Sequence, residues 1–246
     1  MVANLPDRPL YFSRSVTINL AGAPALSERP AAARLEVAEF SAKRQQGATI
    51  LDLRPSALFG HAHVAGSLNI GIASPSFSVW CGFFVNPELP ILLVVEYETE
   101  AARARLELAR IGFDEVVGFI AADDLDETLQ ITQIGARDFL GSMESPPRPV
   151  TLDVRSTQEW AQDHVEGSVN VPLPQLLRQI GRFSRTAPLT ILCGTGYRSS
   201  IAASLLESEG FERLSNVMGC MHAVRHARRP RLPAIERAES ALTWEI

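Results

Sequence analysis

Cysteines are few in this sequence, and they are scattered. Its 246 residues contain only Cys81, Cys193 and Cys220, which are too few for the disulfide framework of a small secreted domain. The sequence also lacks an apolar run long enough to cross a bilayer, and its first residues lack the apolar core of a signal peptide. These absences predict a cytoplasmic protein that has reduced thiols and no membrane partner.

Positive charge and metal ligands are scarce as well. The formal net charge is −5, so the chain has none of the domain-wide basic field that nucleic-acid binding requires. We interpret the short basic run 225–231 as a solvated helix end. The pair His61 and His63 has no further His or Asp cluster beside it. We therefore expect no nucleic-acid partner, no metal and no cofactor.

What the sequence does contain is an internal repeat. A first offset of 101 residues relates two pairs of segments, and an offset of 98 relates a third pair further along the chain. The matching pairs are 49–54 with 150–155, 63–70 with 164–171, and 111–114 with 209–212. The change of offset indicates an insertion of three residues in the first copy, which we place around residues 76–87.

Each copy alternates short apolar runs with helical patterns. In the first copy the pattern predicts helices at 35–46 and 98–111 and strands at 49–53, 67–72, 90–95 and 115–120. Such alternation is typical of βαβ units. We therefore expect an α/β protein with two tandem domains, each an open and mostly parallel sheet with helices on both faces.

The repeat also predicts the domain boundaries. The Pro- and Ser-rich stretch 141–149 precedes the second repeated strand, but Asp138 and Phe139 fit the opening helix of the second copy. We therefore place the boundary near Asp126. The predicted division is an N-terminal extension or connector at 1–30, a first domain at 31–125 and a second domain at 126–246.

One loop of the second copy carries the chemistry. Cys193 directly follows the apolar run 189–192, at the carboxyl end of a predicted strand, where open α/β sheets have their active sites. Gly194 and Gly196 bend the chain, Arg198 closes the loop, and a helical segment follows. Such a loop turns backbone N–H groups toward one point and favours both an anion and a thiolate. It predicts an activated cysteine that carries an anionic or persulfide group, with a buried structural cysteine as the alternative.

The spacing of this loop distinguishes two classes of cysteine enzyme. Four residues separate Cys193 from Arg198, whereas the similar loop of cysteine-dependent phosphatases has five and usually a histidine where this chain has Leu192. The smaller cradle suits a sulfur atom on the cysteine better than a tetrahedral phosphate. The loop resembles the active-site loop of rhodaneses, which are sulfurtransferases and have the form Cys-x-x-Gly-x-Arg-Ser. With the repeat, the resemblance covers nearly the whole chain as a tandem rhodanese.

The resemblance implies a sulfurtransferase of sulfur metabolism that works through a persulfide on Cys193. The sulfur donor would be thiosulfate or a low-molecular-weight persulfide, and the acceptor a thiol, sulfite or cyanide. Arg198 would hold the anionic end of the sulfur donor. Asp153 and Arg155 would support the site, unless they form only a structural ion pair. The predicted substrate-binding loop consists of Gly194, Thr195, Gly196, Tyr197 and Ser199.

For the remaining positions of interest, a structural role is expected or stays open. Val95 occupies the place of the nucleophile in the first copy, and the acidic stretch 96–100 replaces the loop, so we expect this copy to be catalytically silent. We expect Cys81 to pack as a small hydrophobic residue. For Cys220, a buried small residue and a resolving thiol both stay open. Ser199 is expected either to donate a hydrogen bond to the Cys193 sulfur or to cap the following helix.

The N-terminus has a narrower resemblance. Residues 4–12 and 19–24 resemble the connector that follows the metallo-β-lactamase-like domain in persulfide dioxygenase–rhodanese fusions. A dioxygenase domain or protein of that type is therefore a possible partner, although its His-x-His-x-Asp-His pattern does not occur in this chain. Two other functions stay open. One is a sulfur-relay or regulatory binding module, and the other, less favoured, is a phosphatase or arsenate reductase.

Overall fold

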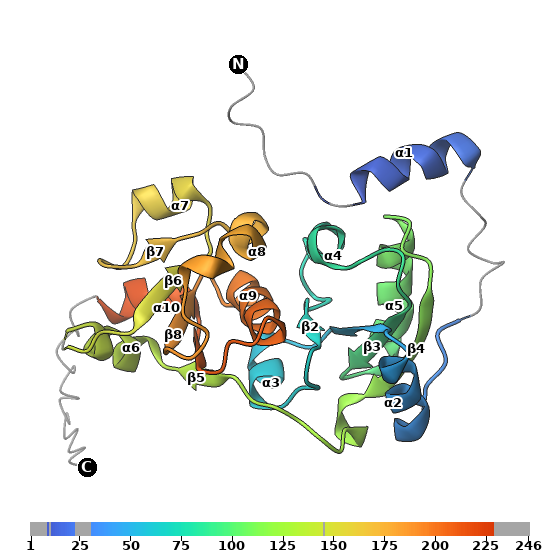
Figure 1. Cartoon of the computed structure of the whole chain (residues 1–246), viewed down its shortest axis with the longest axis horizontal. Helices are drawn as coiled ribbons and strands as arrows, with labels where there is room; N and C mark the ends of the chain where they lie inside the picture. The colour runs from blue at the N-terminus through green and yellow to red at the C-terminus, as the bar shows by residue number, and fades with distance from the viewer. Residues whose placement is uncertain (1–8, 10, 23–30, 145, 229–246) are drawn as a thin grey trace, which may run out of the picture.

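Two parallel sheets, one in each half of the chain, form the frame of the molecule (Figure 1). The computed structural model describes residues 9, 11–22, 31–144 and 146–228. The first sheet has the strand order β2-β1-β3-β4 and the second the order β5-β9-β8-β6-β7. The strands of the first sheet are β1 (Thr49–Asp52), β2 (Leu68–Asn69), β3 (Ile91–Val95) and β4 (Val116–Ala121). Those of the second are β5 (Thr132–Ile134), β6 (Val150–Asp153), β7 (Val169–Asn170), β8 (Leu189–Leu192) and β9 (Leu214–Val217).

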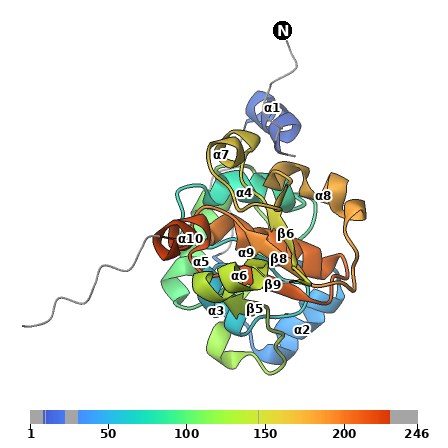
Figure 2. The same ribbon diagram turned by 90° about the vertical axis from the view of Figure 1, so that its left-hand side faces the viewer.

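Helices cover both faces of each sheet, as the buried apolar strands require. Strands β3 and β8 are buried along their whole length, which is typical of central strands in parallel sheets. The first half contains α2 (Val37–Gln45), α3 (Ser56–His61), α4 (Phe77–Phe84) and α5 (Glu98–Ala109). The second half contains α6 (Ala136–Glu144), α7 (Thr157–Gln162), α8 (Leu176–Gln179), α9 (Tyr197–Ser208) and α10 (Cys220–Ala227). Seen from the side of the second half, α6 and α10 lie toward the viewer, on the outer side of its sheet (Figure 2).

The two sheets have the same strand register at the positions that the predicted repeat relates. In the first sheet Asp52 of β1 pairs with Val94 of β3, and in the second Asp153 of β6 pairs with Leu192 of β8. The residues that follow Val94 in β3 and Leu192 in β8 therefore hold equivalent positions in the two halves. Val95 and Cys193 occupy this position, as the offset of 98 predicts. The helices that follow β1 and β6, α3 and α7, are also equivalent at an offset of 101.

Several elements differ from the sequence-based expectation. The extended segment predicted at 67–72 forms a strand only at β2. Beyond β2 the Ile70 and Ile72 N–H groups still donate to the carbonyls of Asp52 and Leu53, and the Asn69 side-chain amide donates to those of Asp52 and Arg54. The region predicted to hold the three-residue insertion contains helix α4, where the second half has the shorter α8 followed by a 3-10 turn. No helix is predicted in the N-terminal extension, yet α1 (Phe12–Ala21) forms there, and the neighbouring Tyr11 packs edge-on against Phe113.

The chain passes from the first sheet to the second between Ala121 and Thr132. The predicted boundary near Asp126 falls in this crossing segment and stays a prediction. Leu129 in the segment forms an antiparallel bridge with His63 of the first half. Among the described residues, no helix is both long enough and apolar enough to span a bilayer. Residues 229–231 of the basic run lie outside the described part of the chain, and the rest of the run forms the end of α10.

A polar stripe on α9 joins the two halves. The stripe consists of Ser200, Ser204 and Glu207, whose spacing places them on one face of the helix. The Ser200 hydroxyl donates to Asn69 Oδ1 at 2.5 Å, and the Asn69 N–H donates to the Ser204 hydroxyl at 3.1 Å. Glu207 lies 2.9 Å from Nε2 of the buried His63. Buried polar groups must be paired, so these contacts fix how the first half sits against the helix that begins at the loop of Cys193.

The matching asparagines of the repeat test this interface. Asn69 and Asn170 both donate to two carbonyls of the neighbouring strand end, but only Asn69 also accepts the Ser200 hydroxyl. We expect Asn69→Ala to destabilise the protein by about 1–3 kcal/mol more than Asn170→Ala, because it leaves a buried hydroxyl of the other half unpaired. Urea denaturation of both variants measures the difference. Equal losses of stability in the two variants would show that the contact between Asn69 and Ser200 does not contribute to the free energy of unfolding.

Candidate functional site

The loop between β8 and α9 places Cys193 at the carboxyl edge of the second sheet. Gly196 adopts the left-handed conformation, with φ of 112°, and is the N-cap of α9. A side chain at Gly194 would press against the Arg198 guanidinium, since its Cβ would lie 3.2 Å from Nη2. The bend therefore requires glycine at 196, and the close approach of Arg198 favours glycine at 194. The helix begins at Tyr197, two residues earlier than expected, so Ser199 lies inside its first turn and is not its cap.

The Cys193 sulfur is held by hydrogen-bond donors in a nearly closed site. The Gly196 N–H donates to it at 3.2 Å, and the Ser199 hydroxyl lies 3.5 Å away. Burial alone would raise the pKa of the Cys193 thiol. Hydrogen bonds from the Cys220 thiol, from the Ser199 hydroxyl and from the backbone N–H groups of Gly196 and Ser199 outweigh burial and lower the pKa well below the usual range. The position at the start of α9 favours the same charge.

Cys220 is the second thiol of this site. It is fully buried, as the prediction of a small buried residue requires, but it lies against the nucleophile. Its sulfur is 3.2 Å from the Ser199 hydroxyl and 3.1 Å from the carbonyl oxygen of Val217. Burial raises the pKa of the Cys220 thiol well above its usual range, and the neighbouring Cys193 raises it further. Of the two sulfurs, Cys193 therefore carries the negative charge.

Arg198 is paired with a carboxylate that the sequence analysis missed. Two guanidinium nitrogens of Arg198 each donate to one oxygen of Glu159, both at 2.7 Å. This bidentate pair lowers the pKa of Glu159 to about 2. Glu159 belongs to the capping box at the start of α7, where its carboxylate also accepts the Ser156 N–H. The pattern Ser-x-x-Glu at 156–159 is a readable signal for that helix start, although not for the pairing with Arg198.

The first half of the chain forms part of the wall beside this loop. The Tyr197 hydroxyl donates to the carbonyl oxygen of Gly71 at 3.2 Å. A Cβ at Gly196 would lie 3.6 Å from the Ser56 hydroxyl, so Ser56 faces the loop as well. Burial raises the pKa of Tyr197, which therefore stays a neutral hydrogen-bond donor. Tyr197 is thus fixed between the halves at the predicted substrate-binding loop.

The Asp-x-Arg pairs have the same geometry in both halves. Asp153 and Arg155 are buried, with Arg155 Nη2 2.7 Å from Asp153 Oδ2 and 2.7 Å from the carbonyl oxygen of Asp163. Asp52 and Arg54 repeat these contacts at 2.6 and 2.7 Å, the second to the carbonyl oxygen of Ala62. The pair is present where the nucleophile is absent, which favours the structural role of the two that the sequence left open.

The matching loop of the first half is filled by its own side chain. The carboxylate of Glu100 accepts the N–H groups of Glu96 and Tyr97, at 2.9 and 3.2 Å. Glu100 is part of the capping box at the start of α5. The first half therefore has Val95 in place of the nucleophile and a carboxylate against its loop, and the catalytic silence of this copy stays a prediction. Cys81 lies fully buried in α4, and burial raises the pKa of its thiol, as expected of a packed small residue.

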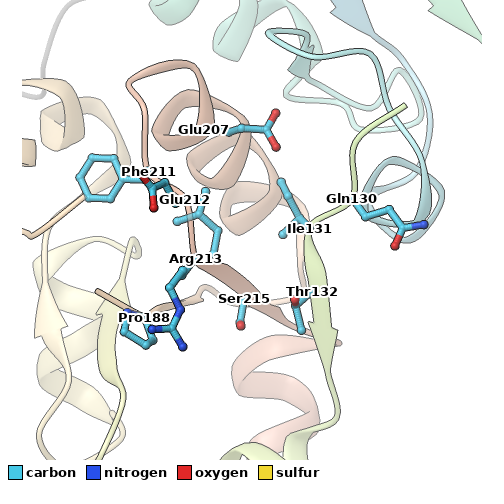
Figure 3. A pocket seen from close by; sticks show the side chains of 10 residues that line it. Gln130, Ile131, Thr132, Pro188, Glu207, Phe211, Glu212, Arg213 and Ser215 are labelled. Carbon is cyan, nitrogen blue, oxygen red and sulfur yellow. The ribbon is translucent and has the colours of Figure 1, made fainter. Parts of the chain in front are cut away.

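A pocket of about 330 Å³ lies elsewhere, at the edge where β5 and β9 begin (Figure 3). Cys193 follows the end of β8, at the opposite edge of the same parallel sheet. The pocket contains no cysteine, and its lining residues are Gln130, Ile131, Thr132, Pro188, Glu207, Phe211, Glu212, Arg213, Leu214 and Ser215. The geometry of a nucleophilic site is found at the loop of Cys193 and not in this pocket.

Comparison with known proteins identifies the second half of the chain. Residues 136–227 match the family described as Rhodanese-like domain. The putative sulfur carrier protein YrkF of Bacillus subtilis (strain 168) is 28% identical over 88 residues, which are 36% of this chain and 48% of YrkF. Thiosulfate sulfurtransferase PspE of Escherichia coli (strain K12) is 27% identical over 70 residues, 28% of this chain and 67% of PspE. A rhodanese-related protein from Thermoplasma volcanium has 23% identity and a TM-score of 0.37, and the match covers 40% of this chain and 95% of that one.

These matches define what is shared. The similarity to the Rhodanese-like domain family covers the part of the chain that runs from α6 to α10 and includes the loop of Cys193. The match does not extend over the first sheet. The chain spans about half the length of YrkF, so the activities named for the relatives are not transferred from these matches.

Removal of the Ser199 hydroxyl tests how the thiolate is stabilised. We expect the Cys193 thiol of the wild-type protein to be alkylated well below the pH at which an ordinary thiol reacts, because its pKa is lowered. Ser199→Ala removes one hydrogen bond to the thiolate, so the midpoint of the pH–rate profile should move to higher pH. Ser208→Ala, at the other end of α9, is the matched control. The measurement is the iodoacetamide labelling rate, mapped to Cys193 by mass spectrometry. An unchanged midpoint in Ser199→Ala would contradict this account.

The two buried ion pairs give a second test. Asp153→Asn and Asp52→Asn each leave a buried arginine without its carboxylate, which should cost about 3–5 kcal/mol of stability in either half. If the pairs are structural, both variants lose stability to a similar extent in urea denaturation. The folded fraction of each should still show Cys193 alkylation at the wild-type rate. A slower rate in Asp153→Asn alone would restore the supporting role that the family resemblance implies.

Proposed function

We propose that the chain is a rhodanese-type sulfurtransferase that moves sulfane sulfur through a persulfide on Cys193. The observation that carries the proposal is the environment of the Cys193 sulfur. It lies at the start of α9, accepts the Gly196 N–H at 3.2 Å and has a pKa lowered by its hydrogen bonds. The rhodanese-like match over residues 136–227 supports the same assignment.

The first step is attack of the Cys193 thiolate on the outer sulfur of the sulfur donor. With thiosulfate, a bond forms between the cysteine sulfur and the sulfane sulfur, and the electron pair of the broken S–S bond leaves with sulfite. The negative charge then lies on the outer sulfur of the persulfide. We infer that loop N–H groups stabilise this charge, because the site already offers donors to an anionic sulfur.

The second step returns the thiolate. A thiol, sulfite or cyanide acceptor attacks the outer sulfur, forms a bond to it and leaves the electron pair of the S–S bond on Cys193. The cysteine is 1% exposed, so the site suits small sulfur donors and acceptors better than the surface of a partner protein. This burial favours small-molecule turnover over the sulfur-relay alternative. The six-residue loop continues to disfavour the phosphatase and arsenate reductase alternatives.

Arg198 holds the anionic end of the sulfur donor in this proposal. It does so while paired with Glu159, so the site offers an ion pair rather than an isolated cation. An incoming anion shares the guanidinium with Glu159 or displaces that carboxylate.

The arrangement of the chain is part of the proposal. We assign residues 31–125 to a silent rhodanese-like domain and residues 126–246 to the active one, with residues 1–30 as a connector. The matched sheet registers support the duplication. Coupling to a persulfide dioxygenase rests on the N-terminal resemblance alone, and residues 4–8, 10 and 23–24 of that stretch lie outside the described residues. The reaction needs reduced thiols, which places it in a reducing compartment such as the cytoplasm.

Steady-state turnover tests the function and the role of Arg198 together. We expect thiosulfate or glutathione persulfide to be consumed with cyanide or a thiol as acceptor, and Cys193→Ala to have no turnover while Cys81→Ala keeps it. Arg198→Ala should lower kcat/KM for thiosulfate by about 2 kcal/mol, or roughly thirtyfold, because a charge-assisted contact to the anion is lost.

The matched control for charge is Arg110→Ala, which removes an exposed arginine of the first half and should leave turnover unchanged. Turnover that persists in Cys193→Ala would reject the proposed function. A full thiosulfate rate in Arg198→Ala would show that the backbone N–H groups alone bind the sulfur donor.

A further inference from the structure

Two cysteines from distant parts of the second half meet at the base of the active-site loop. The Ser199 hydroxyl lies between them, 3.5 Å from the Cys193 sulfur and 3.2 Å from the Cys220 sulfur. The two thiols also affect each other's pKa, which lowers that of Cys193 and raises that of Cys220. The proposed mechanism uses only one of these two thiols, and the structure places both within reach of the same serine hydroxyl.

The backbone holds the two residues next to each other. The Met221 N–H donates to the carbonyl oxygen of Cys193, and the His222 N–H to that of Gly194, both at 3.0 Å. These bonds flank the two cysteines, so their α-carbons are kept close, as a disulfide requires. Cys220 itself has φ of 47°, a left-handed conformation that glycine adopts more readily than cysteine. The chain therefore has a thiol at a position whose backbone favours glycine.

Burial leaves Cys220 with one accessible reaction partner. Cys193 is 1% exposed and Cys220 is 0% exposed, so a bulky external thiol or disulfide cannot reach Cys220 in this structure. A reaction between the two neighbours is intramolecular and has the advantage of a high effective concentration. The sulfur that shares the Ser199 hydroxyl with Cys220 is the cysteine sulfur of Cys193, which becomes the inner sulfur once a persulfide has formed.

We propose that Cys220 is an internal acceptor that discharges the sulfur-loaded site as sulfide, an inference that rests on the proposed function. The Cys220 sulfur attacks the inner sulfur of the Cys193 persulfide and forms a Cys193–Cys220 disulfide. The bond between Cys193 and the outer sulfur breaks, and its electron pair and the Cys220 proton leave as hydrosulfide. The two cysteine sulfurs are oxidised by two electrons and the outer sulfur is reduced by two, so no other oxidant is needed. An external dithiol then reduces the disulfide and restores both thiols.

The charge on the site makes this reaction depend on loading. In the unloaded site burial raises the pKa of Cys220, and the hydrogen bond with Cys193 and its negative charge raise the pKa further. When Cys193 carries a second sulfur, the negative charge moves to the outer atom and away from Cys220. Cys193 then raises the pKa of Cys220 less, and attack by the Cys220 sulfur becomes easier. The resting site therefore suppresses attack by Cys220, and the loaded site permits it.

The test follows a single loaded turnover of the full chain. The protein is loaded with thiosulfate, separated from small molecules and incubated without any added thiol. Sulfide is then measured, and peptides are mapped without reduction. We expect wild-type protein to release sulfide and to show a peptide that links Cys193 to Cys220. Dithiothreitol should restore both thiols and allow a second loading.

Matched variants give the comparison. Cys220→Ser keeps the size and hydrogen-bonding ability of the side chain, and Cys220→Ala removes both. Each should keep the sulfur on Cys193 and release sulfide at a rate at least about tenfold lower than that of the wild-type protein. Cys81→Ala, which removes the buried thiol of the first half, should behave as wild type. The wild-type map is decisive even if a Cys220 variant folds poorly.

Three results would overturn the inference. Wild-type protein could hold its sulfur as long as Cys220→Ser does, release sulfide without the linked peptide, or carry the extra sulfur on Cys220. A different failure belongs to the proposed function. If the wild-type chain takes up no sulfur from thiosulfate or from glutathione persulfide, the sulfurtransferase assignment fails, and the inference built on it falls with it.

Discussion

The hydrogen bonds to the Cys193 sulfur are the interaction on which the account of this protein depends. A thiolate buried to this degree is unfavourable unless it is paired with hydrogen-bond donors. The loop supplies them because Gly196 turns the chain in a left-handed conformation and presents its N–H to the sulfur. The rest of the second sheet places β8 and α9 so that this turn can form. Without these donors, burial would keep the thiol neutral and unreactive.

The first half shows the same frame without this interaction. Its strands have the same register, and its Asp-x-Arg pair has the same contacts. Its loop, however, has Val95 in place of the cysteine, and the carboxylate of Glu100 accepts the N–H groups of Glu96 and Tyr97. The comparison separates the fold from the chemistry, because the same sheet and loop positions hold the nucleophile Cys193 in one half and Val95 in the other. The first half acts on the site through Asn69 and Gly71, which contact α9 and Tyr197.

Features close in sequence or repeated in it could be predicted, and features of tertiary contact could not. The repeat offsets relate Val95 to Cys193, and each of these residues follows the strand partner of the matching aspartate, Asp52 or Asp153, in its own sheet. The pairing of Arg198 with Glu159 spans 39 residues, and no local pattern reports it. Cys220 has the expected burial, but its contact with Ser199 depends on how α10 packs under the loop. The serines of the α9 stripe similarly resemble ordinary helix residues until the other half covers them.

The central claim is that Cys193 is the atom that takes up sulfur, and the most direct measurement is where that sulfur resides. Protein treated with a slight excess of thiosulfate can be digested and its peptides weighed before any reductant is added. The account predicts an added sulfur atom, removable by thiol, on the peptide that contains Cys193, and none on the peptide that contains Cys81. Sulfur found on another residue, or none on the Cys193 peptide and no Cys193–Cys220 disulfide, would contradict it.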